Sequence, residues 1–309
     1  MQKKTKKKEI PSAYIFCASL EKVASHTSAA CRVLQLLLRI RAVQVSTIGA
    51  IKRAAWFAQT NAFNMFLLHV LGNAEVFSAS NVIERANRNL GRMIGGPRIM
   101  FGDVAVEGGF QSGVPCTSRD CLWPKSKNGK VYVPVVVSKK FSSRETEAIR
   151  CALDSFHSKT CVRFMKRSSE RDYIDITPKE GCWSYIGRTT GRQELSLQRG
   201  ACLHRPTIQH ELLHALGFHH EHSRSDRDNH VHVLYRNIMP GAEGQFQKVR
   251  TNNQVSPYDY SSVMHYGRAD FSRNGEPTII PVHDGSIPIG RATQMSLSDV
   301  LRVNRLYCQ

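Results

Sequence analysis

Hydrophobic and polar positions follow a regular period only in the later part of the chain. Residues 1–75 alternate apolar and basic patches without a stable period, and residues 93–113 form a Gly-rich stretch that is typical of an extended linker. Between them, residues 78–92 have the pattern of a short helix with a Ser or Asn cap. From residue 113 onward the pattern predicts a folded domain.

The predicted domain contains both strands and helices. Runs of β-branched and aromatic residues predict strands at 130–137, 172–176 and 194–198. Helical periodicity predicts amphipathic helices at 142–160, 205–220 and 296–307. Pro134 favours a sheet-edge position for its strand, Gly217 ends the second helix, and Ser296 and Asp299 form a capping box for the third.

The charge of the chain does little to identify a partner. Lys and Arg number 43 against 25 Asp and Glu, a formal net charge of +18. The basic residues are dispersed, and the one compact run, at residues 3–8, is typical of a solvated tail. Without an organised basic or aromatic face, nucleic-acid binding is not favoured. No run approaches the roughly 20 apolar residues that a membrane span needs.

Cysteine usage favours secretion. Seven of the nine cysteines follow residue 113, and none forms a CxxC zinc ribbon, which favours disulfides formed in an oxidising compartment. A signal-like segment lies at 52–74, with Lys52 and Arg53 before its apolar run. It lies far too deep for an ordinary signal peptide, so either residues 1–50 are an unusual extension or the start of the sequence is mis-assigned.

The stretch "QHELLHALGFHHEHSRSDRD", residues 209–228, carries the chemistry. His210 and His214 are four residues apart on a predicted helix, so both imidazoles project from one face and can bind one zinc ion. Gly217, with positive φ, lets the chain turn out of the helix and bring His220 to the same metal. His219 and His222 do not fit this spacing, which is that of HExxHxxGxxH.

Glu211 follows the first ligand directly and projects about 100° round the helix from it. That direction suits contact with a metal-bound water, whose pKa zinc lowers to about 7. A carboxylate there can take the proton while the water attacks a peptide carbonyl. The motif therefore predicts peptide hydrolysis, with a zinc ion as cofactor.

HExxH alone is often only the face of a helix, but here Gly217 and His220 complete the longer form. A second element, "SVMHYG" at 262–267, adds the methionine of the metzincin pattern. Together they resemble the astacin family of metzincin zinc proteases, from about Phe101 to Cys308. Within that family, "GVPCTSRDCLWPKSKNGKVYVPVVVS" and "SVMHYGRADFS" are similar to the teleost hatching enzymes (choriolysins).

The resemblance implies an α+β fold of two subdomains around an active-site cleft. The upper one would hold a twisted mixed sheet and two helices, and the irregular lower one would be closed by the C-terminal helix. It also implies three segments: an atypical basic leader with the displaced signal-like segment (1–75), a propeptide with an aspartate switch (76–112) and the catalytic domain (113–309).

Further residues in the catalytic domain acquire roles from the resemblance. Tyr266 would ligate zinc at rest and then bind the oxyanion of the transition state. Without the resemblance, Tyr266 would be interpreted as a packing residue. Met264 would form the Met-turn, and by itself reads as a core methionine. Glu221 would contact the N-terminus freed by activation, and by itself reads as a surface acid.

Upstream, "MFGDVAV" is similar to the propeptide element whose aspartate takes the zinc position meant for water. Asp103 is the matching residue, although by itself it reads as a turn residue. A carboxylate in that position would displace the nucleophile and keep the precursor latent. The resemblance places the start of the mature enzyme near Ser112 or Gly113.

The resemblance also implies three disulfides, Cys116–Cys121, Cys161–Cys308 and Cys182–Cys202. Cys151 is left over, and on a helix of about 100° per residue it points about 150° away from the apolar face. We therefore expect an exposed free thiol that forms some disulfide-linked dimer. The open alternatives are cover by a loop or the propeptide, and pairing with Cys17 or Cys31 in the precursor.

We therefore expect this protein to be a secreted zinc endopeptidase that is made as a zymogen and activated by another protease. We expect it to be mostly monomeric. Its expected substrates are proteins, with egg-envelope glycoproteins implied by the hatching-enzyme likeness. Another astacin-type protease acting on matrix or digestive substrates would look similar. An inactive binding protein on the same scaffold is less favoured, because its three histidines, Glu211 and Tyr266 are all intact.

Overall fold

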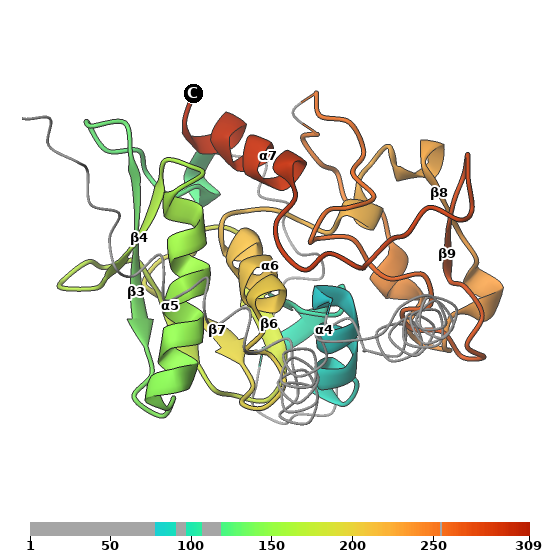
Figure 1. Cartoon of the computed structure of the whole chain (residues 1–309), viewed down its shortest axis with the longest axis horizontal. Helices are drawn as coiled ribbons and strands as arrows, with labels where there is room; N and C mark the ends of the chain where they lie inside the picture. Colours follow the sequence, from blue (N-terminus) through green and yellow to red (C-terminus); the bar gives the residue numbers. More distant parts are fainter. Residues whose placement is uncertain (1–77, 91–96, 107–118, 254) are drawn as a thin grey trace, which may run out of the picture. The chain divides into compact units, whose positions relative to one another are not determined.

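The computed structural model describes residues 78–90, 97–106, 119–253 and 255–309, all within one compact unit, Val76–Gln309 (Figure 1). The signal-like segment, Cys17, Cys31, Cys116 and the expected cleavage region near Gly113 lie outside the described residues. Among the helices in the described ranges, none is long and apolar enough to cross a membrane.

A seven-stranded mixed sheet forms the centre of the first half of this unit. Its strand order is β1-β2-β6-β7-β5-β3-β4. Strands β3, β4, β5 and β7 run parallel, whereas β6 is antiparallel to β7. The strands are β1 (Arg98–Met100), β2 (Val104–Val106), β3 (Val131–Val137), β4 (Val162–Lys166), β5 (Tyr173–Thr177), β6 (Cys182–Tyr185) and β7 (Arg192–Leu197).

The edge position expected from Pro134 is wrong, because β3 lies between β4 and β5. Its residues 131–135 pair with β4, whereas pairing with β5 begins only at Val135. Pro134 therefore lies where the strand has a neighbour on one side only. The missing N–H costs little at that point, although the strand as a whole is internal.

Two helices, α5 (Ser143–His157) and α6 (Arg205–Ala215), pack against each other and against the sheet (Figure 1). Helix α5 begins at a capping box in which the Ser142 hydroxyl accepts from the Glu145 N–H and the Glu145 carboxylate accepts from the Ser142 N–H. The predicted apolar face of α5 is confirmed as buried, at Ile149, Ala152, Leu153 and Phe156. The shared core fixes the position of α6 and of the histidines on it.

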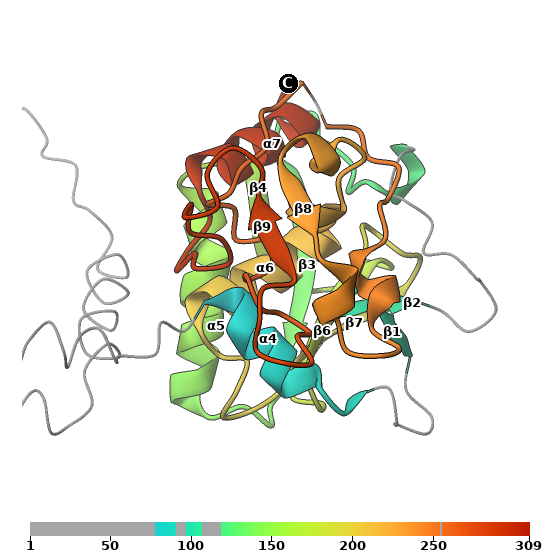
Figure 2. The same ribbon diagram turned by 90° about the vertical axis from the view of Figure 1, so that its right-hand side faces the viewer.

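The second half of the unit is largely irregular (Figure 2). Strands β8 (Val231–Val233) and β9 (Ile279–Pro281) form a small antiparallel sheet. Short 3-10 turns connect the rest: η3 (Glu221–Ser223), η4 (Arg227–Asn229), η5 (Tyr235–Asn237) and η6 (Glu243–Phe246), with η2 (Arg119–Cys121) far upstream. Helix α7 (Leu297–Tyr307) has the predicted Ser296–Asp299 capping box and packs Val303 and Tyr307 into the main core.

The segment expected as a linker is in part a hairpin. Strands β1 and β2 pair with each other, and β2 joins the free edge of β6 in parallel, with Val104 opposite Ser184 and Ala105 opposite Tyr185. The linker prediction is wrong over these residues because Val104 and Val106 bury their side chains. Helix α4 (Ala79–Asn87), capped by Ser78, packs against α6 and β6.

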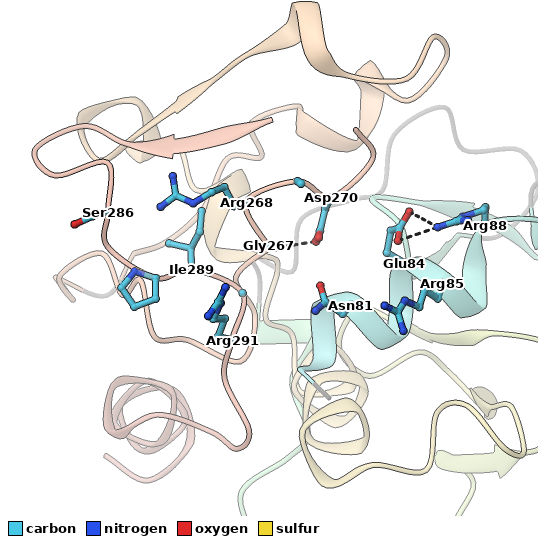
Figure 3. A pocket seen from close by; sticks show the side chains of 13 residues that line it. Asn81, Glu84, Arg85, Arg88, Gly267, Arg268, Asp270, Ser286, Ile289 and Arg291 are labelled. Atoms are coloured by element: carbon cyan, nitrogen blue, oxygen red, sulfur yellow. Dashed lines mark hydrogen bonds and ion pairs between the residues drawn. The ribbon is translucent and has the colours of Figure 1, made fainter. Parts of the chain in front are cut away.

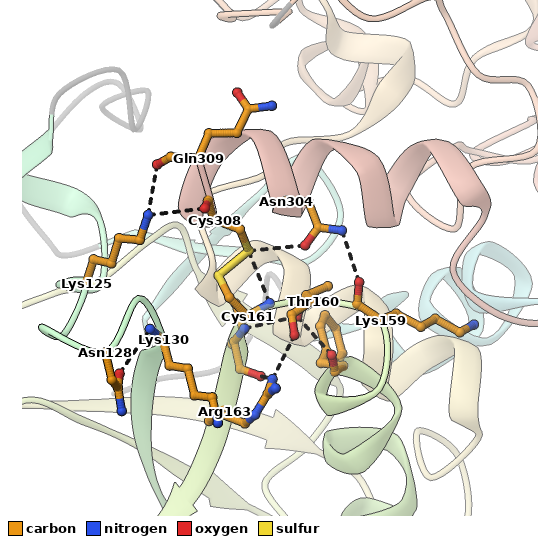
Figure 4. The surroundings of a disulfide bond; sticks show 12 residues. Lys125, Asn128, Lys130, Lys159, Thr160, Cys161, Arg163, Asn304, Cys308 and Gln309 are labelled. Carbon is orange, nitrogen blue, oxygen red and sulfur yellow. Dashed lines mark hydrogen bonds between the residues drawn. A yellow bond between two sulfur atoms is a disulfide. The ribbon is translucent and has the colours of Figure 1, made fainter.

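The structure joins Cys161 to Cys308 (Figure 4) and Cys182 to Cys202, the two pairings that the resemblance implies within the described residues. The first bond closes a sequence separation of 147 residues. In the chain-entropy account, a loop of that size stabilises the fold by about 5 kcal/mol. The bond holds the end of α7 to the beginning of β4.

The prediction that Cys151 is an exposed free thiol is wrong. Cys151 is only 9% exposed and is disulfide-bonded, as is Cys121, and the partners of both lie outside the described residues. A helical wheel gives the direction of a side chain but not the segments that cover the opposite side of the helix. A dimer linked through an exposed Cys151 is therefore no longer expected.

Candidate metal centre

Helix α6 places two imidazoles side by side in the interior. The Nδ1 atom of His210 lies 2.8 Å from the Val263 carbonyl, and Nδ1 of His214 lies 2.7 Å from the Phe218 carbonyl. When each Nδ1–H donates to its carbonyl, the ring orientation is fixed and Nε2 is left as a lone-pair donor. Both Nε2 atoms face the same point.

His220 reaches that point because the helix ends abruptly. Gly217 has a φ of +99°, as the sequence predicts, and its N–H donates to the His214 carbonyl. A residue with a Cβ is strained in that conformation, which favours glycine there. The chain then returns so that Nε2 of His220 lies 3.1 Å from Nε2 of His210.

The fourth member of the cluster is Asp103, in the hairpin turn between β1 and β2. Its Oδ2 atom lies 2.9 Å from Nε2 of His210, and its Oδ1 atom lies 3.3 Å from Nε2 of His214 and 3.1 Å from Nε2 of His220. All four ligand atoms lie within 4.8 Å of one another. The structure thus brings together residues that are more than 100 positions apart.

These four residues fit a zinc ion. Three imidazole nitrogens and a carboxylate oxygen are a donor set that zinc prefers. All four side chains are buried, and Asp103 Oδ1 and His214 Nε2 have no hydrogen-bond partner in the described structure. Burial raises the pKa of Asp103, but the three histidines more than offset this and hold it well below its ordinary value. The aspartate is therefore charged, as a metal ligand must be.

Glu211 lies beside this cluster without joining it. Its side chain is fully buried, and neither carboxylate oxygen has a hydrogen-bond partner among the described residues. Burial and the negative charge of Asp103 raise the pKa of Glu211 well above its usual range. Buried carboxyl groups with perturbed pKa values are candidates for proton transfer.

Four hydrogen bonds hold the turn that carries Asp103. The Tyr266 hydroxyl donates to the Phe101 carbonyl at 2.6 Å, and the Gly102 N–H donates to Gln245 Oε1 at 2.7 Å. The side-chain amide of Asn87 donates to the Gly102 carbonyl at 2.8 Å, and the Ser184 N–H donates to the Asp103 carbonyl at 3.0 Å. Donors and acceptors on both halves of the unit thus fix the aspartate.

Tyr266 is placed near the cluster, with its hydroxyl committed to Phe101. Its ring stacks on His222, with ring centroids 3.7 Å apart, which gives this histidine outside the metal spacing a packing role. Met264 is buried in the main core, and its carbonyl accepts from the Glu221 N–H. The segment from Val263 to Tyr266 therefore contacts the site at several points.

The surface-acid interpretation of Glu221 is wrong. Its carboxylate is buried and accepts hydrogen bonds from Arg302 on α7, from Arg224, and from the Asp259 N–H. Two arginines compensate the buried charge. Contact with a freed N-terminus stays a prediction, because residues 107–118 lie outside the described ranges.

Sequence reasoning missed two residues of α4 that fasten it to the site. Asn87 Nδ2 also donates to the Cys182 carbonyl at 2.6 Å, and Asn87 Oδ1 accepts from the Cys182 N–H at 2.8 Å. The Ser80 hydroxyl accepts from the Gly267 N–H at 2.7 Å and donates to the Asp270 carboxylate. No local pattern signals these contacts, because each depends on how α4 docks.

Known proteins match this chain over the same region. Residues 119–308 match the family model described as Astacin, a peptidase family. High choriolytic enzyme 1 of Oryzias latipes is 46% identical over 198 residues, which are 64% of this chain and 73% of that protein. Its solved structure, described as a hatching enzyme zinc-protease, has a TM-score of 0.62 and covers 64% of this chain and 100% of that chain.

The low choriolytic enzyme of Oryzias latipes is 41% identical over 239 residues, 77% of this chain and 86% of that protein. A match over 77% of this chain is longer than the region from residue 119 to the end. The similarity therefore extends upstream of residue 119, into the segment that holds α4 and Asp103. The family model covers more than half of the chain, and the α+β fold and the histidine cluster agree with it. The chain therefore belongs to the astacin family of peptidases and is a zinc metalloendopeptidase.

Proposed function

We propose that this chain is the latent precursor of a secreted endopeptidase whose mature form acts on egg-envelope proteins. The observation that carries the latency is the contact of the Asp103 carboxylate with all three histidines. The substrate follows from the choriolytic enzymes of Oryzias latipes, whose names state that activity. Secretion is supported by the disulfides of the described domain.

In the precursor, Asp103 fills the point where the three Nε2 atoms converge, and the hairpin and α4 hold it there. Cleavage near Gly113 by an activating protease would free the propeptide from the catalytic domain. With Asp103 gone, His210, His214 and His220 would hold zinc with one position open to water. The mature enzyme would then work mostly as a monomer.

In the mature enzyme, His210, His214 and His220 would hold zinc, which would act as a Lewis acid and would lower the pKa of water from 15.7 to about 7. Glu211 would accept the proton of the attacking water, because it directly follows His210 on α6 and its carboxylate has no hydrogen-bond partner among the described residues. The same carboxyl group can pass the proton to the departing amine. Tyr266 donates its hydroxyl hydrogen bond to the oxyanion once the Phe101 carbonyl has left.

The test compares three substrates with the activated enzyme, each with and without a zinc chelator. Casein should be cleaved and the chelator should stop the cleavage, whereas an inactive binding protein would leave casein intact. Isolated egg envelopes should be solubilised at a lower enzyme concentration than gelatin is digested. Equal or faster digestion of gelatin would overturn the egg-envelope substrate and favour a matrix or digestive role.

Replacing Tyr266 by phenylalanine should lower kcat by about 10²- to 10³-fold, as the loss of one oxyanion donor does elsewhere. KM should change much less, because the proposed bond forms mainly in the transition state. Initial rates on a fluorogenic peptide measure both constants. Tyr235→Phe, at a half-exposed tyrosine of η5, is the matched control. An unchanged kcat would leave Tyr266 a packing residue.

A further inference from the structure

The segment proposed as the propeptide meets the catalytic domain through contacts of different kinds. Helix α4 uses polar groups: its Ser80 hydroxyl accepts from the Gly267 N–H and donates to the Asp270 carboxylate, beside a polar cavity that Gly267 and Asp270 help to line (Figure 3). The hairpin turn uses an aromatic ring, since Phe101 is only 6% exposed and lies in an apolar cluster. This apolar contact is two residues before Asp103, and therefore close to the metal centre.

The catalytic domain contributes three side chains to the surroundings of Phe101. Ile186, directly after β6, and Val249 belong to the same apolar cluster. The His219 ring lies edge-on to the Phe101 ring, with centroids 6.2 Å apart and an angle of 83° between the planes. The other members of the cluster come from the hairpin: Met100, Val104 and Val106. Release of the propeptide would therefore uncover Ile186 and Val249 together, beside His219.

The polar atoms of His219 take no part in holding the described fold together. Both ring nitrogens are buried, and neither has a hydrogen-bond partner among the described residues. Buried polar atoms without a partner are uncommon in folded proteins, and a functional role is one reason for keeping them. The contact that the ring does make, edge-to-face with Phe101, is an arrangement that aromatic pairs prefer. His219 thus faces an aromatic ring of the propeptide.

The backbone of Phe101 indicates that its surroundings hold it firmly. Its φ is +50°, in the left-handed region that bulky residues rarely adopt. Such a conformation persists only where the surrounding contacts compensate for its cost. The Phe101 carbonyl accepts from the Tyr266 hydroxyl, the group that would donate to the oxyanion in the mature enzyme. Phe101 therefore lies where a residue next to the cleaved bond of a substrate would lie.

We propose that Ile186, His219 and Val249 form a subsite of the mature enzyme that takes an aromatic side chain next to the cleaved bond. In the precursor Phe101 occupies this subsite, and a phenylalanine or tyrosine of the substrate replaces it after activation. His219 determines the preference, since an edge-to-face pair adds to the free energy gained from burial of the ring alone. The substrates are protein segments with an aromatic residue at the cleaved bond, an inference that rests on the proposed release of the propeptide.

The test measures the cleavage preference of the mature enzyme. A peptide library digested by the enzyme gives, by mass spectrometry, the residues on both sides of each cleaved bond, and aromatic residues should be enriched directly beside it. A well-cleaved sequence is then resynthesised with alanine in place of that aromatic residue. The kcat/KM of the aromatic peptide should exceed that of the alanine peptide by at least about tenfold, because even one methylene group in an apolar pocket changes kcat/KM by about that factor.

Variants of His219 test its part in this preference. His219→Ala should lower the ratio of the two kcat/KM values by roughly two- to tenfold, as expected for the loss of one edge-to-face pair. His219→Phe, which keeps a ring, should preserve the ratio. His232→Ala, at an exposed histidine of β8, is the matched control and should leave it unchanged. A general loss of zinc or of folding would slow both peptides alike, so the ratio reports on the subsite itself.

Two results would overturn the subsite while the endopeptidase activity stands. One is a digest in which aromatic residues are not enriched beside the cleaved bond, and the other is an equal ratio for His219→Ala and His232→Ala. Failure of the proposed function would appear in a separate assay, as a mature enzyme that leaves casein intact or an uncut precursor that already digests it.

Discussion

Replacing Glu211 by glutamine should remove nearly all peptide hydrolysis from the mature enzyme while leaving zinc bound. The amide has the size of the carboxyl group but cannot accept the proton of the attacking water. General-base catalysis contributes about 10²- to 10⁴-fold, so a loss of kcat in that range is expected. The three histidines that hold the metal are unchanged. Casein or peptide hydrolysis gives the rate, and atomic absorption gives the zinc content per chain.

Glu276→Gln, at an exposed loop glutamate, is the matched control and should keep full activity. An uncharged isostere at the fully buried Glu211 should not harm folding, because a neutral group is less costly to bury than a charged one. If the zinc-loaded Glu211→Gln enzyme keeps a rate near that of the parent, Glu211 is not the base.

The features that could be predicted from the sequence are those encoded locally. His210, His214 and His220 lie within eleven residues, and helical spacing plus one glycine suffices to bring them together. The capping box at Ser296 is similarly local, because its two residues are three positions apart. In such cases the geometry of a single turn or helix determines the contact.

The features that could not be predicted depend on how distant segments dock. Asp103 could be named only through the resemblance, because nothing in its own neighbourhood points to histidines more than 100 residues away. Asn87 gave no signal at all, since its partners are main-chain atoms of β6 and of the hairpin. The burial and disulfide bond of Cys151 also depend on distant segments, because the apolar face of α5 does not show what covers its opposite side.

Replacing Asp103 by alanine should make the uncut precursor active before any cleavage. The carboxylate lies where the three Nε2 atoms converge, the position meant for water, and the loss of one charged contact is worth about 1.5–3 kcal/mol. The four hydrogen bonds with Tyr266, Gln245, Asn87 and the Ser184 N–H still hold the turn. We therefore expect activity to rise by roughly 10- to 100-fold over the parent precursor, yet to stay below that of the mature enzyme, because the hairpin still lies on β6.

The assay is hydrolysis of a short fluorogenic peptide by precursors whose uncut state is verified by mass. Asp154→Ala, at a half-buried aspartate of α5, controls for the loss of a carboxyl group elsewhere. Asn87→Ala should raise the activity in the same direction but less, because it loosens the turn without removing the carboxylate from the histidines. The double variant should approach the mature rate. If the uncut Asp103→Ala precursor is as inactive as its parent, Asp103 does not cause the latency. Cover of the cleft by α4 and the hairpin would then account for it.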